Sequence, residues 1–137
     1  MSQKTIIISG IPVAQPRARI FTRNGHVMSW DPAGEAKKIA KAEIAKQTNK
    51  IPDVAIEMFV KFFLPVPKST SKKKKALMLT NEIKHIKRPD TSNYLKFTED
   101  ALDSVAFKDD SQLWHVDAVK LYSDEPRTVI TIKWEDD

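Results

Sequence analysis

The feature that most constrains the fold is an alternating apolar run from Val54 to Leu64, followed directly by Pro65 and Pro67. Successive side chains of a β-strand point to opposite faces of the sheet, so a period of two indicates a strand. Prolines directly after the run indicate where the strand ends, because proline cannot continue a hydrogen-bonded ladder. The sequence therefore predicts a sheet protein whose central strand lies near the middle of the chain.

Other elements are predicted on both sides of this strand. A strand is expected over 5–9, and Asn24-Gly25 between two β-favouring runs predicts a hairpin over 20–30. Three helices are expected from their caps and periodicity: 31–48 beginning at Asp31-Pro32, 72–79 after a Ser/Thr cap, and 90–104. Strands are expected over 113–122 and 127–134, as an antiparallel pair. This order predicts a single α+β domain over 1–137, with a mixed or antiparallel sheet and helices packed on one face.

Composition excludes several classes of site. The chain has 137 residues and no cysteine, so disulfides, zinc–thiolate sites and cysteine nucleophiles are excluded. No apolar run approaches the roughly 18 residues that a membrane span needs, and the apolar stretch near Met1 is too short for a signal peptide. We therefore expect a soluble, cytoplasmic protein that acts without contact to a membrane.

The net charge of +5 is unevenly distributed along the chain. Residues 61–96 carry ten Lys/Arg and two Asp/Glu, whereas residues 97–137 carry four Lys/Arg and eleven Asp/Glu. A basic zone beside an acidic one indicates a phosphate-binding face next to a cation site. A solvated charged surface is the ordinary alternative for the same pattern.

The helix predicted from Asp90 to about Ser104 has one polar face. At about 100° per residue, Asn93, Lys96 and Asp100 fall on one side, and most of the apolar side chains fall on the other. Each acidic residue also has an ordinary interpretation. Asp90 suits a helix N-cap, Asp100 and Asp103 suit a solvated surface, and the Asp109-Asp110 pair suits a turn. Their joint occurrence after a basic stretch favours oxygen ligands for Mg²⁺ beside cations for phosphate.

Three motifs at these positions resemble one family. They are Pro89-Asp90-x-x-Asn93-x-x-Lys96, Asp100-Ala101-Leu102 after Glu99, and Asp109-Asp110-x-Gln112. Together with a Pro/Arg-rich segment over 10–19, they resemble the signature of the RusA-like Holliday-junction resolvases. The resemblance covers most of the chain, from about Ile6 to Trp134.

The resemblance implies a small α+β homodimer that binds four-way DNA junctions and cuts them symmetrically in recombination and repair. It implies Mg²⁺ as cofactor, with Mn²⁺ as a substitute, held by Asp90, Asp110 and the adjacent Asp109. Asp90, Asp110 and Lys96 then carry catalysis, supported by Asn93. The resemblance also implies a protein of the bacterial cytoplasm that acts at the nucleoid. Its gene would belong either to the cell or to an integrated phage.

The chain departs from this family pattern at one position. Ser92 stands where the family has a second aspartate, and serine cannot replace the charge of a carboxylate. Either Asp109 or Asp100 compensates, or the site binds metal more weakly, or the protein binds junctions without cutting them well. We favour compensation.

Basic residues outside the helix are predicted to hold the arms of the DNA by phosphate contacts. They are Arg17, Arg19, Arg23, Lys72, Lys73, Lys74, Lys75, Lys87 and Arg88. A C₂ dimer would match the two strands that must be cut, and Phe62, Phe63, Leu64 and Trp114 are candidates for its interface. The main alternative to a nuclease is a non-catalytic DNA-binding protein, which Ser92 and the basic zone would support.

Overall fold

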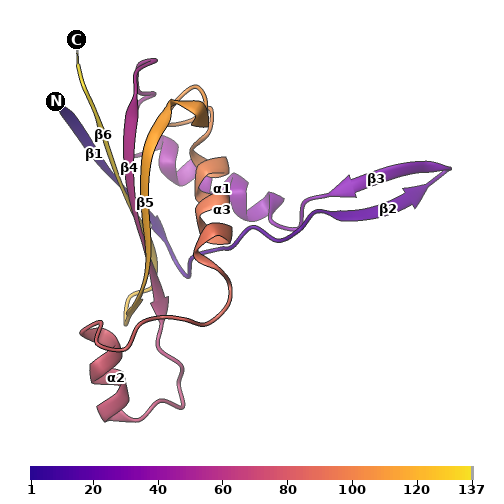
Figure 1. Cartoon of the computed structure of the whole chain (residues 1–137). Coiled ribbons are helices and arrows are strands. Elements are labelled where there is room, and N and C mark those ends of the chain that lie inside the picture. The colour runs from indigo at the N-terminus through magenta and orange to yellow at the C-terminus, as the bar shows by residue number, and fades with distance from the viewer. Residues whose placement is uncertain (137) are drawn as a thin grey trace.

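The computed structural model describes residues 1–136 and has a four-stranded sheet, a separate two-stranded arm and three helices (Figure 1). The sheet strands are β1 (Ser2–Ser9), β4 (Ile56–Pro65), β5 (Leu113–Ser123) and β6 (Arg127–Trp134). The arm consists of β2 (Arg19–Arg23) and β3 (His26–Trp30). The helices are α1 (Gly34–Ala45), α2 (Lys72–Leu79) and α3 (Thr91–Leu102), and a 3₁₀ turn spans Asp110–Gln112. The predicted α+β class is therefore confirmed.

The sheet is mixed, with strand order β1-β6-β4-β5. β4 pairs with β6 in antiparallel orientation and with β5 in parallel orientation. β4 is thus an interior strand, as its alternating sequence predicts. Its residues Ile56, Met58, Val60, Phe62 and Leu64 are all buried, whereas the residues between them are half-buried or exposed.

The predicted antiparallel pairing of the last two strands is wrong. β5 and β6 follow one another in the chain, but β4 lies between them in the sheet. The long alternating face of β4 buries more apolar surface in an interior position than at an edge, and this tertiary preference overrides the sequence-adjacent pairing. Because β4 and β5 are parallel, the chain between them must cross over the sheet, and α2 and α3 lie in this crossover.

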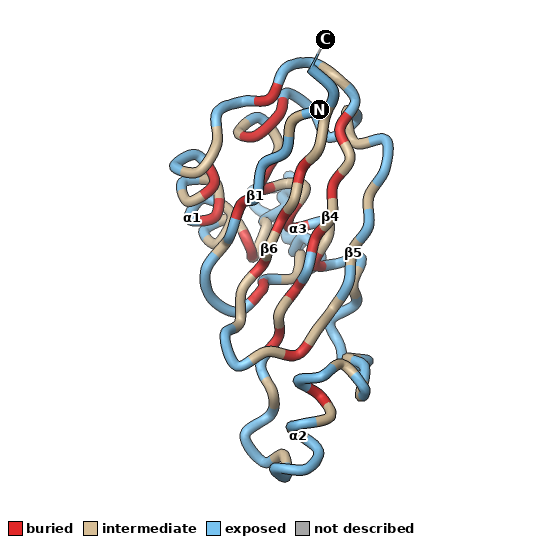
Figure 2. The backbone as a smooth tube through the Cα atoms, turned by 90° about the vertical axis from the view of Figure 1, so that its left-hand side faces the viewer, coloured by how far each residue is buried: buried red, intermediate tan, exposed pale blue. Residues whose placement is uncertain are grey.

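The hydrophobic core lies between one face of the sheet and the helices α1 and α3 (Figures 1 and 2). α3 contributes Tyr94, Phe97, Ala101 and Leu102 to this core. The opposite face of the sheet carries no helix, and α2 lies beyond one end of the sheet (Figure 2). Within residues 1–136, none of the helices has the length and apolar character needed to cross a bilayer.

The predicted hairpin is confirmed and projects away from the sheet and helices (Figure 1). Asn24 and Gly25 have φ values of 52° and 77°, the left-handed conformation that a two-residue primed turn requires at both positions. All ten residues of its strands are exposed.

The predicted boundaries of the first helix are wrong at both ends. α1 begins at Gly34 and ends at Ala45, whereas the sequence predicts Asp31 to Thr48. Asp31 accepts a hydrogen bond from the Ala33 N–H at 2.9 Å, so it forms a turn before the helix. The Lys72–Leu79 helix is confirmed, with Ser71 as its N-cap.

Asp31 also fixes the base of the arm to the body of the protein. Its carboxylate accepts hydrogen bonds from Gln15 Nε2 at 2.8 Å and from Lys37 Nζ at 2.7 Å. Lys37 Nζ lies 3.1 Å from Asp100 on α3, so one lysine connects the end of the arm with the helix that carries the predicted active site. The Lys37 hydrogen bond is the largest of the causes that lower the pKa of Asp31 from 3.8 to about 2.

This lowered pKa predicts a pH dependence of stability. A carboxyl group whose pKa is lower in the folded protein stabilises it above the unfolded pKa, and this contribution disappears as the pH falls through the folded pKa. We therefore expect Asp31→Asn to destabilise the protein at pH 5 and above, and the difference from wild type to shrink as the pH falls from about 4 to about 2. Denaturant unfolding measured across this range tests the expectation. Asp53→Asn, at an exposed position, is the control, and a difference that stays constant down to pH 2 would contradict it.

Candidate active site

The predicted catalytic residues all lie in the crossover between β4 and β5. Asp90 directly precedes α3, Lys96 lies within it, and Asp109 and Asp110 follow it. The 3₁₀ turn contacts α3, so the second acidic motif lies against the helix that begins at the first. The crossover therefore carries both acidic motifs, and it packs the second one against the helix that begins after the first.

Asp90 occupies the N-cap of α3, but its side chain makes no capping hydrogen bond. The carboxylate is exposed, so the ordinary role of an N-cap aspartate is not realised here. Lys120 on β5 fixes the segment before Asp90. Its Nζ donates to the carbonyl oxygens of Lys87 at 2.7 Å and Pro89 at 3.1 Å. No sequence signal indicates this contact, because Lys120 is 31 residues away from Pro89.

The Asp109–Asp110 turn is held by the side chain of Gln112, a role that was not predicted from the sequence. Gln112 Oε1 accepts hydrogen bonds from the backbone N–H groups of Lys108 at 3.0 Å and Asp109 at 3.2 Å. Its Nε2 donates to the carbonyl oxygens of Pro52 and Val54 at 3.0 and 3.1 Å. Asp109 completes a capping box with Gln112, and the Asp-x-x-Gln spacing was the available signal for it.

Asp109 and Asp110 differ in what their carboxylates do. Asp109 caps the turn and accepts a hydrogen bond from the Ser111 hydroxyl at 2.5 Å, which lowers the pKa of Asp109. The pKa of Asp110 is raised, first by partial burial and then by Asp109 and the negative charge of Asp103. A bound cation would relieve the repulsion among these acidic groups.

The turn that carries Asp110 contacts α3, and the charge of Asp110 acts on residues of this helix. The negative charge of Asp110 contributes to a raised pKa of Glu99, after burial, and to a raised pKa of Lys96, after Asp100. Asp103 has one buried carboxylate oxygen without a hydrogen-bond partner among the described residues. Glu99 and Asp103 are thus acidic neighbours of Asp110 that were not among the predicted site residues. Glu99 lies on α3 and Asp103 directly follows the helix, and their spacing of four residues was the signal in the sequence.

Lys96 and Asp100 form an ion pair on this polar face, with Lys96 Nζ 3.1 Å from Asp100 Oδ1. Asp100 Oδ2 pairs with Lys37, also at 3.1 Å. Asp100 is therefore held between two lysines, which favours a role in orienting Lys96 over a role as a metal ligand. Ser92 and Asn93 are exposed near the start of α3.

The carboxylates of Asp90 and Asp110 are chemically suited to a divalent cation. Among residues 1–136 no three acidic or histidine side chains are arranged to hold a metal ion together. Mg²⁺ in phosphate-processing sites usually binds one or two carboxylates, while substrate phosphates and waters complete its shell. The uncapped Asp90 carboxylate and the repelled Asp110 carboxylate are ligands of this type.

The predicted DNA-binding residues lie in three places. Arg17, Arg19 and Arg23 belong to the arm and the segment before it, Lys72–Lys75 form the first turn of α2, and Lys87 and Arg88 precede Asp90. Lys75 Nζ lies 3.1 Å from Asp124, so its charge is partly neutralised. The other three lysines of α2 are exposed at the positive end of the helix dipole.

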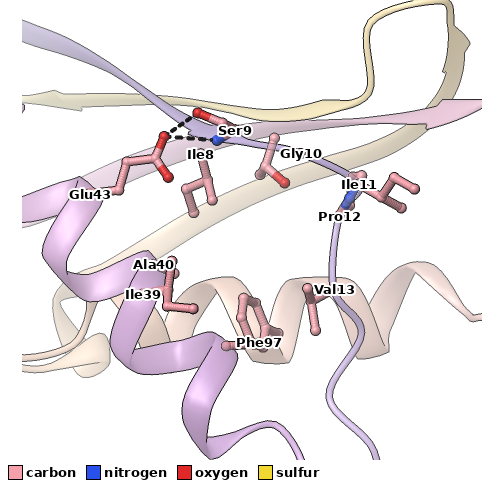
Figure 3. Close-up of a pocket in the computed structure, with 12 residues that line it drawn as sticks. Ile8, Ser9, Gly10, Ile11, Pro12, Val13, Ile39, Ala40, Glu43 and Phe97 are labelled. Atoms are coloured by element: carbon pink, nitrogen blue, oxygen red, sulfur yellow. Dashed lines mark hydrogen bonds between the residues drawn. The ribbon is translucent and has the colours of Figure 1, made fainter.

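A separate apolar pocket of about 200 Å³ lies at the end of β1, between α1 and the segment leading to the arm (Figure 3). Ile8, Val13, Ile39 and Phe97 line it. Its acidic residue, Glu43, accepts a hydrogen bond from the Ser9 N–H at 2.9 Å. The pocket therefore does not include the acidic residues described above.

Comparison with known proteins identifies the family. The family model described as endodeoxyribonuclease RusA matches residues 9–133. The chain is also 37% identical over 131 residues to the uncharacterized protein YqaN of Bacillus subtilis (strain 168), covering 92% of each chain. The match contains the Asp90 motif, the polar face of α3 and the Asp109–Asp110 turn. The chain belongs to the RusA family of endodeoxyribonucleases.

Proposed function

We propose that this protein is a Mg²⁺-dependent endonuclease that cuts four-way DNA junctions symmetrically as a homodimer, in recombination and repair. The observation that carries the proposal is the position of Asp110. Its turn packs against α3, where acidic neighbours and Lys96 influence its carboxyl group, within a chain of an endodeoxyribonuclease family. Acidic groups beside a fixed cation suit the handling of a metal ion and a phosphate together.

In this proposal Asp90 and Asp110 hold the metal ion, with Asp109 beside them. Bound Mg²⁺ would polarise the phosphodiester and lower the pKa of a bound water. Gln112 and Asp109 hold the backbone of the turn, so the turn that carries Asp110 is already ordered before a metal ion binds. Lys120 does the same for the segment before Asp90.

Lys96 supplies positive charge for the phosphate that is cut. Its ion pair with Asp100 orients the ammonium group on α3, and this pair is the first cause of the raised pKa of Lys96. A lysine that stays protonated can stabilise negative charge that develops on the phosphate oxygens in the transition state. Asp100 then acts as a positioning residue for Lys96.

The basic groups on either side of the site support DNA as substrate. The first turn of α2 carries four consecutive lysines, although positive charge at a helix N-terminus is unfavourable for the helix. A phosphate backbone would compensate this repulsion, and such contacts give affinity without reading sequence.

Dimerisation would supply a second site for the second strand. Of the side chains considered for the interface, Phe62 and Leu64 are buried in the core and are excluded. Trp114 is exposed, and Phe63 lies on the sheet face without helices, under the Arg127 guanidinium. This uncovered sheet face is the surface that we propose for the dimer.

A junction-binding protein without cleavage remains the second candidate, because Ser92 replaces a family aspartate. Incubation with a synthetic four-way junction and a linear duplex, with and without Mg²⁺, separates the candidates. Cleavage of the junction alone supports a resolvase, cleavage of both DNAs indicates a general nuclease, and binding without cleavage supports the second candidate.

We expect Asp90→Asn to lower the cleavage rate by about a hundredfold or more and to leave junction affinity equal or better. The change removes a proposed metal ligand and also one negative charge that repels phosphate. Single-turnover cleavage and gel-shift titrations measure the two effects, and Asp53→Asn is the matched control. A folded variant that cuts at the wild-type rate would remove Asp90 from the mechanism.

Replacing Lys72, Lys73 and Lys74 by alanine should weaken binding to all DNAs and reduce its salt dependence. For every phosphate that a lysine no longer neutralises, the slope of log K against log salt should fall in magnitude by about 0.9. The control is the triple change of Lys4, Lys46 and Lys50 to alanine, which removes the same charge elsewhere. If both triple variants change the slope equally, α2 is not a specific DNA contact.

Ser92→Asp tests whether the site lacks a ligand. We expect no decrease in the Mg²⁺ concentration for half-maximal cutting, because Asp109 and Asp110 already concentrate negative charge after the helix. A titration of cutting rate against Mg²⁺ for both proteins measures this. A clear shift to lower Mg²⁺ would show that the natural site is short of a carboxylate.

A further inference from the structure

The arm formed by β2 and β3 is a two-stranded hairpin that pairs with no other strand of residues 1–136. It projects from the rest of the chain, and Ile20, Phe21, Val27, Met28 and Trp30 are all exposed on it (Figure 1). An isolated two-stranded hairpin is marginally stable in water. Exposed apolar and aromatic side chains on such a hairpin indicate a surface that another molecule covers.

The strand register divides the arm into two different faces. Residues that are directly opposite in an antiparallel pair share a face. One face carries the pairs Arg19–Trp30, Phe21–Met28 and Arg23–His26. The other face carries Ile20–Ser29 and Thr22–Val27. The first face therefore alternates cationic and aromatic or thioether groups, and the Arg19 guanidinium lies 5.8 Å from the centre of the Trp30 ring.

Charge identifies the kind of molecule that fits the first face. From Arg17 to Trp30 the sequence contains three arginines and no acidic residue. A second copy of the chain would bring an arm of the same positive charge, which would repel this one. Helix α1, beside the apolar pocket, also carries more lysines than acids, so it is not a complementary surface for the arm either. DNA offers phosphates for the arginines and flat bases for Phe21 and Trp30. A two-stranded ribbon also has the width that a DNA groove accepts.

The base of the arm is fixed to the helix that begins at Asp90. The Gln15 N–H donates to the Asn93 carbonyl oxygen at 2.9 Å, and Asp31 is held by Gln15 and Lys37. A strand of five residues at about 3.3 Å per residue reaches about 17 Å. DNA strands rise about 3.4 Å per nucleotide, so the arm extends over about five base steps from its base.

We propose that the arm is a wedge that places Phe21, Met28 and Trp30 against unstacked bases at the branch point of the junction. This inference rests on the proposed function, because it assigns a part of the same substrate to the arm. Apolar side chains that enter a base step unstack it, and a branch point has fewer stacking contacts to lose than a continuous duplex. The fixed base of the arm would then set the distance between the branch point and the phosphate that is cut.

The test measures base unstacking directly, with the full chain and a four-way junction that carries 2-aminopurine at the branch point. Divalent metal is left out so that the DNA stays intact. Phe21→Ala/Met28→Ala removes two of the three side chains of the proposed wedge but no charge. Ile20→Ala/Val27→Ala is the matched control, with two aliphatic truncations on the opposite face of the same arm. Sedimentation gives the mass of each protein, and the same measurements on linear duplex give the reference.

We expect wild type and the control variant to raise 2-aminopurine fluorescence at the branch point. The Phe21→Ala/Met28→Ala variant should lose most of this rise and bind the junction about five- to tenfold more weakly, with an unchanged salt slope. A rise that is equal in all three proteins would overturn the wedge. A loss of dimer mass in either arm variant would overturn it too, and would assign the arm to contact between copies. If the wild-type protein binds the junction no better than the duplex, the proposed function fails, and the wedge fails with it. If the wild-type protein prefers the junction but the fluorescence rise is equal in all three proteins, only the wedge fails.

Discussion

The parallel pairing of β4 with β5 is the constraint from which the other features of the structure follow. Two parallel neighbours cannot be joined by a tight turn, so the chain must leave the end of β4 and return to the opposite end of the sheet. The crossover from residue 66 to residue 112 contains α2, α3 and both acidic motifs. Packing of α3 through Phe97, Ala101 and Leu102 then fixes the helix against the sheet. The position of the candidate site is a consequence of this connection.

Polar contacts between the crossover and other parts of the chain hold the site in place. Lys120 on β5 binds the carbonyl groups before Asp90, and Gln112 binds the carbonyl groups before β4. Lys41 on α1 donates to the carbonyl oxygens of Asp100 and Asp103 at the end of α3, at 2.9 and 2.8 Å. These long side chains satisfy backbone groups that a helix end or a loop leaves free. Both acidic motifs are therefore fixed from the sheet and from α1.

Acidic and basic groups are separated in space. Acidic groups and Lys96 gather on the polar face of α3, whereas most of the predicted DNA contacts lie on α2 and on the arm, away from the carboxylates. Separation limits the repulsion between the acids and the phosphates of the DNA. The contacts from Asp31 through Lys37 to Asp100 connect the base of the arm with α3, so the arm and α3 keep a fixed relative position.

Local elements and the chemistry of the motifs could be predicted from the sequence. The period of two identified β4, Asn24-Gly25 identified the hairpin, Ser71 identified the start of α2, and the spacing of Asp90, Lys96 and Asp110 identified the family. Each of these signals depends on residues that are close in the chain.

Other features arise only when the chain folds. β4 separates β5 from β6 because burial of its apolar face outweighs pairing between neighbours in sequence. In the same way, Asp31 forms a turn held by Lys37, Asp100 pairs with two lysines, and Lys120 and Gln112 support the acidic groups. Most of these contacts join residues far apart in sequence, and only the folded chain brings their charges within a few ångströms, where electrostatic attraction is strong.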